Sequence, residues 1–408
     1  MNNNKISRKK LEKKLAEVYE ITKNDFEKSK HVGVLSGISG VSLFQFYYAK
    51  FLDNDEYADV GAEVIAHTIE RINSGYTYPT FCTGIAGAGW TIEFLNKEGF
   101  IEIDNDALLS QLDSFLHEVM KEDIKNEYYD FLHGALGYGY YFLKRYQNTK
   151  SPDLKNTYKE YLTFLITELK NSSRKGEKGI YWEYELSKTQ GFRGANLSLS
   201  HGMASIINFL CRLYPYEDFK TSVEDLLKGT IEFVIHNKYK NSNNPSLFPS
   251  WIHDQMKEYA TSRLAWCYGD LGMGISLWRA GKILKIKAYQ ELAIDVLKHS
   301  AKRRDREEAR IQDAGLCHGA YGVVTIFNYI YQETKDPLFK ETADFWMYEA
   351  LEMDIHQESY AGYKQWRGDL EEWHNEINLL EGITGIGLAL LSYLAPEEAN
   401  WDECLMIH

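Results

Sequence analysis

Seven amphipathic segments alternate along the chain with seven apolar runs. The apolar runs, such as 41–44, 206–210, 323–327 and 386–391, have almost no polar face, as expected of helices buried on both sides. Short strands would give similar runs, but the length of the amphipathic partners favours helix. The pattern therefore predicts an all-α fold, an α/α toroid in which seven inner helices are wrapped by seven outer ones. The predicted outer helices are 11–28, 57–72, 107–122, 154–169, 223–234, 288–302 and 339–353.

A short glycine motif, G-x-x-G, opens each apolar run. Its first glycines are Gly37, Gly84, Gly134, Gly202, Gly269, Gly319 and Gly382. In the fourth copy Ser205 replaces the second glycine. Recurrence at spacings of 47 to 68 residues indicates a helical-hairpin repeat. Small residues at these places would let the N-termini of the inner helices gather at one end of the ring, where their dipoles favour anions.

The two positions before each first glycine sample one layer of this predicted ring. The position directly before it holds Ser36, Thr83, His133, His201, Tyr268, His318 and Glu381. The position before that holds Leu35, Cys82, Leu132, Ser200, Cys267, Cys317 and Leu380. Histidines and cysteines thus concentrate in one layer, which we interpret as the functional mouth.

Cys267 and Cys317 stand 50 residues apart in the same register, and His318 follows the second cysteine directly. Two buried thiols and a hydrogen-bonded histidine would be the structural alternative. Equal register in consecutive repeats favours metal, because neighbouring repeats bring such side chains within ligand reach. Two cysteines and one histidine with a fourth position open is the composition of a catalytic zinc site. Cys82 shares the register but belongs to a distant repeat, and we interpret it as a packing residue.

Three further polar residues fall near the same predicted mouth. His201 is a candidate acid–base residue or a histidine satisfied by backbone, and Asp130 either orients that imidazole or caps a helix. Arg263 precedes Cys267 by four positions and would lie nearby, or else form a surface salt bridge. His133 is interpreted as structural.

Composition narrows the classes of function. The formal net charge is −13, which argues against nucleic acid and is compatible with a cationic peptide partner. The polar N-terminus shows no secretory signal, and no apolar run approaches the ~20 residues that span a bilayer. Five cysteines without an export signal indicate reduced thiols in the cytoplasm. No composition shift marks a linker, so residues 1–408 are predicted to form a single domain, with irregular insertions near 171–196, 241–262 and 356–376.

The glycine repeats and the motifs at 199–202, 266–269 and 317–319 resemble the lanthionine synthetase C-like (LanC) family. These motifs read Leu-Ser-His-Gly, Trp-Cys-Tyr-Gly and Cys-His-Gly, and the likeness, closest to stand-alone bacterial lantibiotic cyclases, covers essentially the whole chain. It implies an α/α toroid that binds one Zn²⁺ per chain through Cys267, Cys317 and His318.

The resemblance also implies a reaction and partners. Such enzymes add a peptide cysteine across the double bond of dehydroalanine or dehydrobutyrine and so close a thioether ring. By the resemblance His201 matches the active-site histidine, Asp130 its assisting aspartate and Arg263 the arginine before the first zinc cysteine, while Trp266 and Tyr268 lie near the substrate. The expected partner is a dehydrated precursor peptide, leader plus core, with a dehydratase and a transporter in a modification complex. The expected location is the cytoplasm, with membrane association through partners.

Three alternatives remain at this point. A eukaryotic-type LanC-like enzyme would use the same zinc chemistry to add glutathione to dehydrated residues. An α/α-toroid glycosidase would need two carboxylates ~5–10 Å apart, for which Asp130 and Glu381 are the candidates, but would leave the Cys/Cys/His register unexplained. A non-catalytic scaffold would bind no metal.

Overall fold

The computed structural model describes residues 6–187, 191–240, 243–253 and 261–408. The chain forms two compact units, which are described separately. Unit 1 consists of Met1–Tyr78 and Arg304–His408, and unit 2 of Pro79–Arg303. The single domain expected from the sequence stays a prediction.

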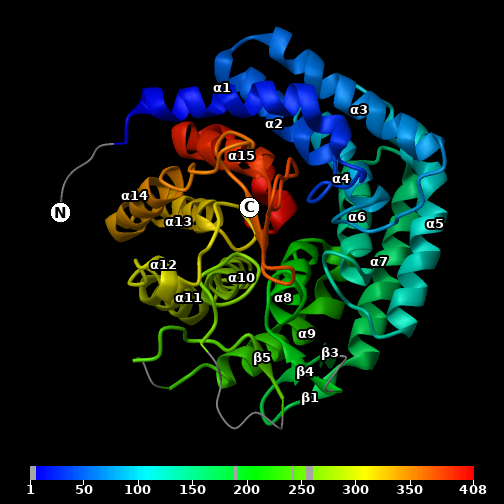
Figure 1. The fold of residues 1–408 in the computed structure, drawn as a ribbon. Coiled ribbons are helices and arrows are strands. Elements are labelled where there is room, and N and C mark those ends of the chain that lie inside the picture. The colour runs from blue at the N-terminus through cyan, green and yellow to red at the C-terminus, as the bar shows by residue number, and fades with distance from the viewer. Residues whose placement is uncertain (1–5, 188–190, 241–242, 254–260) are drawn as a thin grey trace. The chain divides into compact units, whose positions relative to one another are not determined.

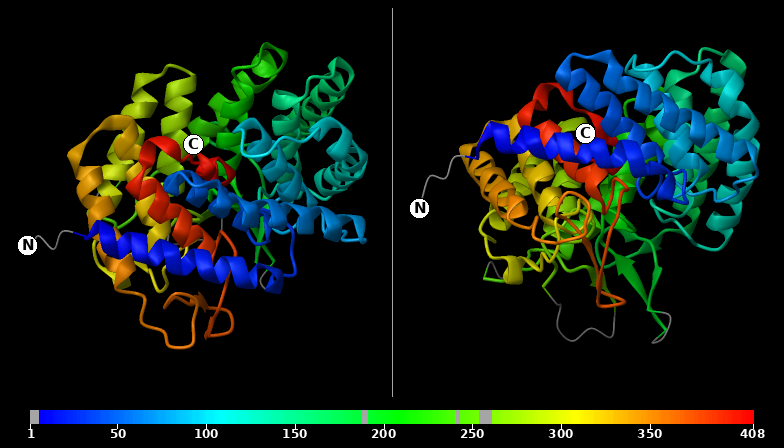
Figure 2. Two further views of the ribbon diagram at one scale, coloured as in Figure 1. Left: turned by 90° about the horizontal axis from the view of Figure 1, so that it is seen from above. Right: turned by 45° about the horizontal axis from the view of Figure 1, so that its top comes forward.

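Unit 1 contains three of the predicted inner helices. α2 (Ser39–Leu52), α13 (Ala320–Thr334) and α15 (Ile383–Leu394) pack side by side in the order α13, α15, α2. The outer helices α1 (Arg8–Asp25), α3 (Ala58–Asn73) and α14 (Pro337–Leu351) pack on α15, α2 and α13 respectively (Figure 1). Both views of Figure 2 show α1 running alongside α15. The N-terminal helix therefore covers the last inner helix rather than the first.

Shorter elements complete unit 1. Helix α12 spans Arg306–Ala309, and a hairpin of β6 (Gln365–Arg367) and β7 (Glu372–His374) follows α14. The 3-10 turns are Phe26–Lys28, Asp55–Tyr57, Pro396–Glu398 and Trp401–Leu405.

Unit 2 repeats the inner–outer alternation. The inner helices α4 (Ile85–Lys97), α6 (Ala135–Asn148), α8 (Met203–Leu213) and α10 (Asp270–Ile283) pack on one another in chain order. The outer helices are α5 (Asn105–Lys125), α7 (Pro152–Ser172), α9 (Glu217–His236) and α11 (Lys287–Ser300) (Figure 1). In α5 the buried residues Leu116, Met120 and Ile124 recur every four positions. This spacing puts them on one face, which packs toward α4, α6 and α7.

Short antiparallel strands occupy the insertions, where the sequence predicted only irregular chain. β1 (Arg174–Lys175) pairs with β2 (Ile180–Tyr181), and β4 (Phe192–Asn196) lies between β3 (Tyr184–Ser187) and β5 (Trp251–Ile252). The part of the predicted insertion at 241–242 and 254–260 lies outside the described residues. The strands form through pairing between distant segments, which the local pattern does not encode.

Each predicted inner helix within the described residues begins at its glycine motif. Six of them start at the residue directly after the first glycine, and α2 starts two residues after Gly37. Backbone hydrogen bonds also join the layer before the glycines: Leu380 donates to Leu35 (N···O 2.8 Å) and Cys317 to Leu380 (2.9 Å) in unit 1, and Cys82 to Leu132 (2.9 Å) in unit 2. The layer predicted from sequence register is thus a hydrogen-bonded feature within each unit.

The second glycine of the last motif provides a test of this packing. A Cβ at Gly385 would lie 1.9 Å from the Leu379 carbonyl oxygen and 2.6 Å from a methyl carbon of Leu316. We expect Gly385→Ala to destabilise the protein by about 1–3 kcal/mol, the usual cost of overpacking, although alanine is the better helix former. Chemical denaturation measures the change. Gly229→Ala in α9 is the control, because its Cβ would meet only the Ile180 side chain, at 3.1 Å or more; equal effects of both substitutions would contradict the close-packing account.

Candidate active site

A repeated turn fixes the backbone just before four of the inner helices. Four residues before the first glycine stand Thr80, Asp130, Ser198 and Asn378. The side chain of each accepts the backbone N–H of the residue three positions on, at 2.7–3.2 Å. Small polar side chains are favoured in such turns because they can accept a backbone N–H a few residues further along the chain. The turn therefore holds in place the positions where the sequence concentrates histidines.

Asp130 combines its hydrogen bond in this turn with a contact to His201. One carboxylate oxygen accepts the backbone N–H of His133 at 2.7 Å, and the other lies 2.5 Å from Nδ1 of His201. Asp130 is 6% exposed, so its charge is little screened by water. The contact uses Nδ1 and leaves Nε2 of His201 for another partner. The sequence offered helix capping and imidazole orientation as alternatives for Asp130. The N-cap of α6 is Gly134, so Asp130 does not cap the helix; it closes the turn before it, and its other oxygen contacts the imidazole.

The surroundings of His201 favour its protonated form. Burial alone would lower the pKa of His201, but the hydrogen bond to Asp130, the charge of Asp130 and the nearby Cys267 together raise it above its ordinary value. The His133 ring lies parallel to that of His201 at 6.3 Å between centroids, and burial lowers the pKa of His133. The pKa values of the two neighbouring histidines therefore move in opposite directions, and the proton is favoured on His201.

Tyr268 is a further neighbour of His201. Its ring centroid is 6.0 Å from that of His201, and its hydroxyl accepts from Nδ2 of Asn196 at 3.3 Å. Trp251 packs edge-on against the Tyr268 ring at 6.0 Å. Asn196 ends β4 and Trp251 begins β5, where the two are paired. Sequence reasoning missed both residues, because only the pairing of two insertions brings them to Tyr268.

The other predicted residues of unit 2 differ in exposure. Trp266 is 1% exposed and belongs to the core, whereas the Arg263 side chain is exposed in the segment leading to Cys267. Gly269, two residues after Cys267, has φ +99°, a region that glycine adopts without strain. A Cβ there would also lie 2.4 Å from the Arg263 carbonyl oxygen. The bend after Cys267 thus depends on glycine.

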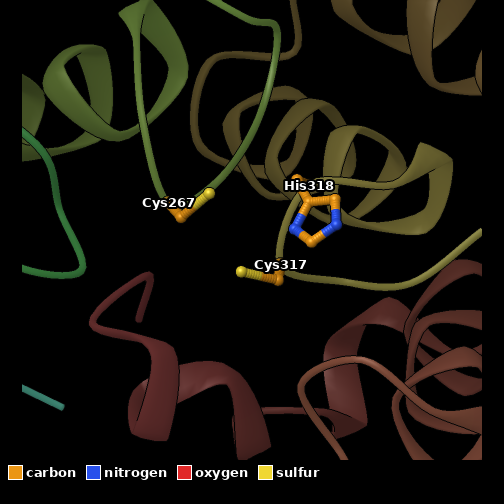
Figure 3. A group of neighbouring side chains, drawn as sticks. All are labelled: Cys267, Cys317 and His318. Atoms are coloured by element: carbon orange, nitrogen blue, oxygen red, sulfur yellow. The ribbon is translucent and has the colours of Figure 1, made fainter. Parts of the chain in front are cut away.

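Backbone hydrogen bonds hold both cysteines of the predicted metal site. The Cys267 carbonyl accepts the N–H of Leu199 at 3.0 Å, and the Cys317 N–H donates to the Leu380 carbonyl. Cys267 is 5% exposed, and Cys317 and His318 are half-buried. One ligand atom from each of Cys267, Cys317 and His318 lies within 4.8 Å of the other two, and Figure 3 shows the two sulfurs and a ring nitrogen facing one another. Cys82 is buried, as a packing residue would be.

The donor set fits zinc. Ligand atoms of a tetrahedral Zn²⁺ with two thiolates and an imidazole are about 3.5–3.8 Å apart, as Zn–S and Zn–N distances of about 2.3 and 2.0 Å require. The three ligand atoms, which already lie within 4.8 Å of one another, would therefore have to move only slightly closer to bind zinc. Thiolates and neutral imidazoles are also the protein ligands that this ion prefers.

Within the described residues, no helix is long and apolar enough to cross a membrane.

Two solved structures are similar to this chain to different degrees. The solved structure of nisin cyclase has a TM-score of 0.71 at 19% sequence identity, over 98% of this chain and 97% of that one. A cellobiose 2-epimerase from Bacillus thermoamylovorans B4167 has a TM-score of 0.47 at 13% identity, over 76% of this chain and 86% of its own. The likeness to nisin cyclase shows a shared fold, and the predicted α/α-toroid class is confirmed. The family model "Lanthionine synthetase C-like protein" matches residues 28–406. The chain belongs to the lanthionine synthetase C-like family.

Proposed function

We propose that this protein is a zinc-dependent lanthionine cyclase. It would add cysteine thiols of a dehydrated precursor peptide to dehydroalanine or dehydrobutyrine residues of the same peptide. The observation that carries the proposal is the group of Cys267, Cys317 and His318, whose ligand atoms lie within 4.8 Å of one another in a member of this family. Zinc held there would supply a Lewis acid that keeps the substrate thiol deprotonated near neutral pH.

The remaining residues would complete the addition. As the sulfur bonds to the β-carbon, the π-electrons of the double bond move toward the carbonyl and an enolate forms. His201 would then donate a proton to Cα, and Asp130 would hold the imidazole in the orientation that presents Nε2. Arg263 and the N-termini of the inner helices would stabilise the negative oxygen of the enolate. Tyr268, beside His201, would contact the substrate peptide.

The proposal predicts near-stoichiometric zinc in protein purified without added metal. Cys267→Ala/Cys317→Ala should bind little zinc and form no thioether, because two of three ligands are gone. Elemental analysis gives the metal, and loss of free thiol on a dehydrated peptide, followed by mass spectrometry, gives the reaction. Full zinc occupancy in the double variant would exclude this site, and wild-type protein without zinc would favour a scaffold.

Competition with added glutathione distinguishes the proposed cyclase from a eukaryotic-type LanC-like enzyme. A cyclase should use the thiol of the peptide itself, so added glutathione should not appear in the product. Glutathione adducts with no ring closure would instead favour the eukaryotic-type LanC-like activity. Hydrolysis of a glycoside would favour the glycosidase alternative. A dehydratase and a transporter as partners, and a cytoplasmic location, remain predictions of the same proposal.

A further inference from the structure

Asp313 is a buried carboxylate beside one of the proposed metal ligands. It lies between α12 and α13, five residues before His318, and is 3% exposed. Its Oδ2 is 3.6 Å from Nε2 of His318. Neither the glycine register nor the family motif points to this residue, because it stands outside the two positions that hold the other candidates.

The carboxylate of Asp313 is held from two sides. Its Oδ1 accepts the backbone N–H of Gly315 at 3.1 Å, and its Oδ2 accepts that of Trp366, in β6, at 3.0 Å. A Cβ at Gly319 would lie 2.4 Å from Oδ1, so the next residue after His318 must stay small for the carboxylate to keep this place. An ionised carboxylate has about four acceptor sites, so Oδ2 can face the imidazole of His318 while it accepts from Trp366.

The position of Asp313 selects which ring nitrogen of His318 is left for metal. In a neutral imidazole one nitrogen carries the proton and the other offers a lone pair. A carboxylate next to Nε2 favours the proton there and leaves the lone pair on Nδ1. In Figure 3 one ring nitrogen faces the sulfurs of Cys267 and Cys317 and the other points away from them. The arrangement suits a metal ligand that is backed by a carboxylate.

The pair of Asp130 and His201 uses the opposite nitrogen. There the carboxylate contacts Nδ1 and leaves Nε2, which suits a histidine that must reach a substrate atom. At His318 the carboxylate is beside Nε2 and Nδ1 is left. Two aspartate–histidine pairs therefore present their imidazoles in two different ways.

We propose that Asp313 is a positioning residue that orients His318 and sets its tautomer for zinc, held in turn by the amide of Trp366. The inference rests on the proposed zinc site and adds a residue to it. Carboxylates that back a ligand histidine typically change metal affinity by about 10- to 100-fold when replaced. We expect Asp313→Asn to weaken zinc binding by that factor while all three ligands remain.

Zinc affinity, measured by competition with a chelator on the full chain, tests the proposal without any assay of activity. Asparagine keeps one oxygen for Gly315 but places an amide NH₂ where Oδ2 now faces His318 and accepts from Trp366. Asp402→Asn is the matched control: Asp402 is 4% exposed and accepts from Nδ1 of His408 at 2.9 Å, so the substitution changes a buried carboxylate beside an imidazole away from the ligands. Its zinc affinity should equal that of the wild type.

A double-variant comparison separates orientation of the imidazole from general damage to the loop. In a His318→Cys background there is no imidazole to orient, so adding Asp313→Asn should change zinc affinity little. An equal loss in both backgrounds, or wild-type affinity in Asp313→Asn, would overturn the inference. Asp313→Ser decides the matter if the asparagine variant does not fold, since serine can still accept from Gly315. Wild-type protein that binds no zinc would instead refute the proposed function.

Discussion

His201→Asn should retain zinc and form thioether roughly 10²- to 10⁴-fold more slowly, the range for removal of a general acid–base group. Asparagine preserves polarity and approximate size but cannot deliver a proton. The three proposed ligands are other residues, so metal content should not change. Zinc analysis and peptide cyclisation, measured on the same samples, check both halves of the prediction. A variant that loses its zinc would make His201 a ligand and refute its role as proton donor.

Asp130→Asn should slow the reaction in the same direction and also change its pH dependence. The hydrogen bond and charge of Asp130 raise the pKa of His201, while burial opposes them. Without that charge the pKa of His201 falls, so the imidazole loses its proton at lower pH. The falling limb of activity that reports the protonated histidine should therefore move to lower pH. An unchanged profile would show that Asp130 acts only as the cap of its turn.

The alternation of helices could be read from the sequence because it rests on local patterns. The segment 107–122 has its apolar residues on one face and became α5, whereas the run after Gly382 is apolar all round and became the buried α15. Register also led to the site, since Cys267, Cys317 and His318 stand at fixed offsets from their glycines. Periodicity and offset are properties of neighbouring residues, and a single chain displays them.

The contacts that the sequence did not reveal join segments far apart in the chain. Asn196 and Trp251 reach Tyr268 only because β4 pairs with β5. Asp313 is tied to Trp366 across 53 positions. Such contacts depend on which loops lie next to each other in the fold, and the local periodicity of the sequence does not predict this.

The least expected feature of unit 2 is an ionic cluster buried between two inner helices, α4 and α6, and two outer helices, α5 and α7. Arg145 of α6 is fully buried and contacts Glu93 of α4 (N···O 2.5 Å) and Asp113 of α5 (3.4 Å). Tyr158 of α7 accepts from Arg145 at 2.5 Å and donates to Asp113 at 2.6 Å, and Tyr141 also donates to Asp113. One guanidinium thus links side chains of four helices.

Arg145→Met should destabilise the protein by about 3–5 kcal/mol, because it leaves Glu93 and Asp113 as buried carboxylates without their cation. Methionine replaces much of the side-chain length, so the loss in free energy of unfolding comes mainly from the missing charge and less from the missing volume. Urea denaturation of the variant measures the change. Arg306→Met is the control: Arg306 pairs with Glu349 at 2.7 Å, but their side chains are 38% and 24% exposed, and such pairs contribute about 0–1 kcal/mol.

A triple variant tests whether the cost comes from the unpaired charges. Glu93→Gln and Asp113→Asn added to Arg145→Met remove the buried negative charges together with their partner. Tyr141 and Tyr158 donate to different oxygens of Asp113. Asp113→Asn keeps one of these acceptors, and the other tyrosine hydroxyl can accept from the new amide group, so most of the lost stability should return. If the triple variant is as unstable as Arg145→Met alone, the guanidinium stabilises unit 2 by packing between the four helices rather than by neutralising Glu93 and Asp113.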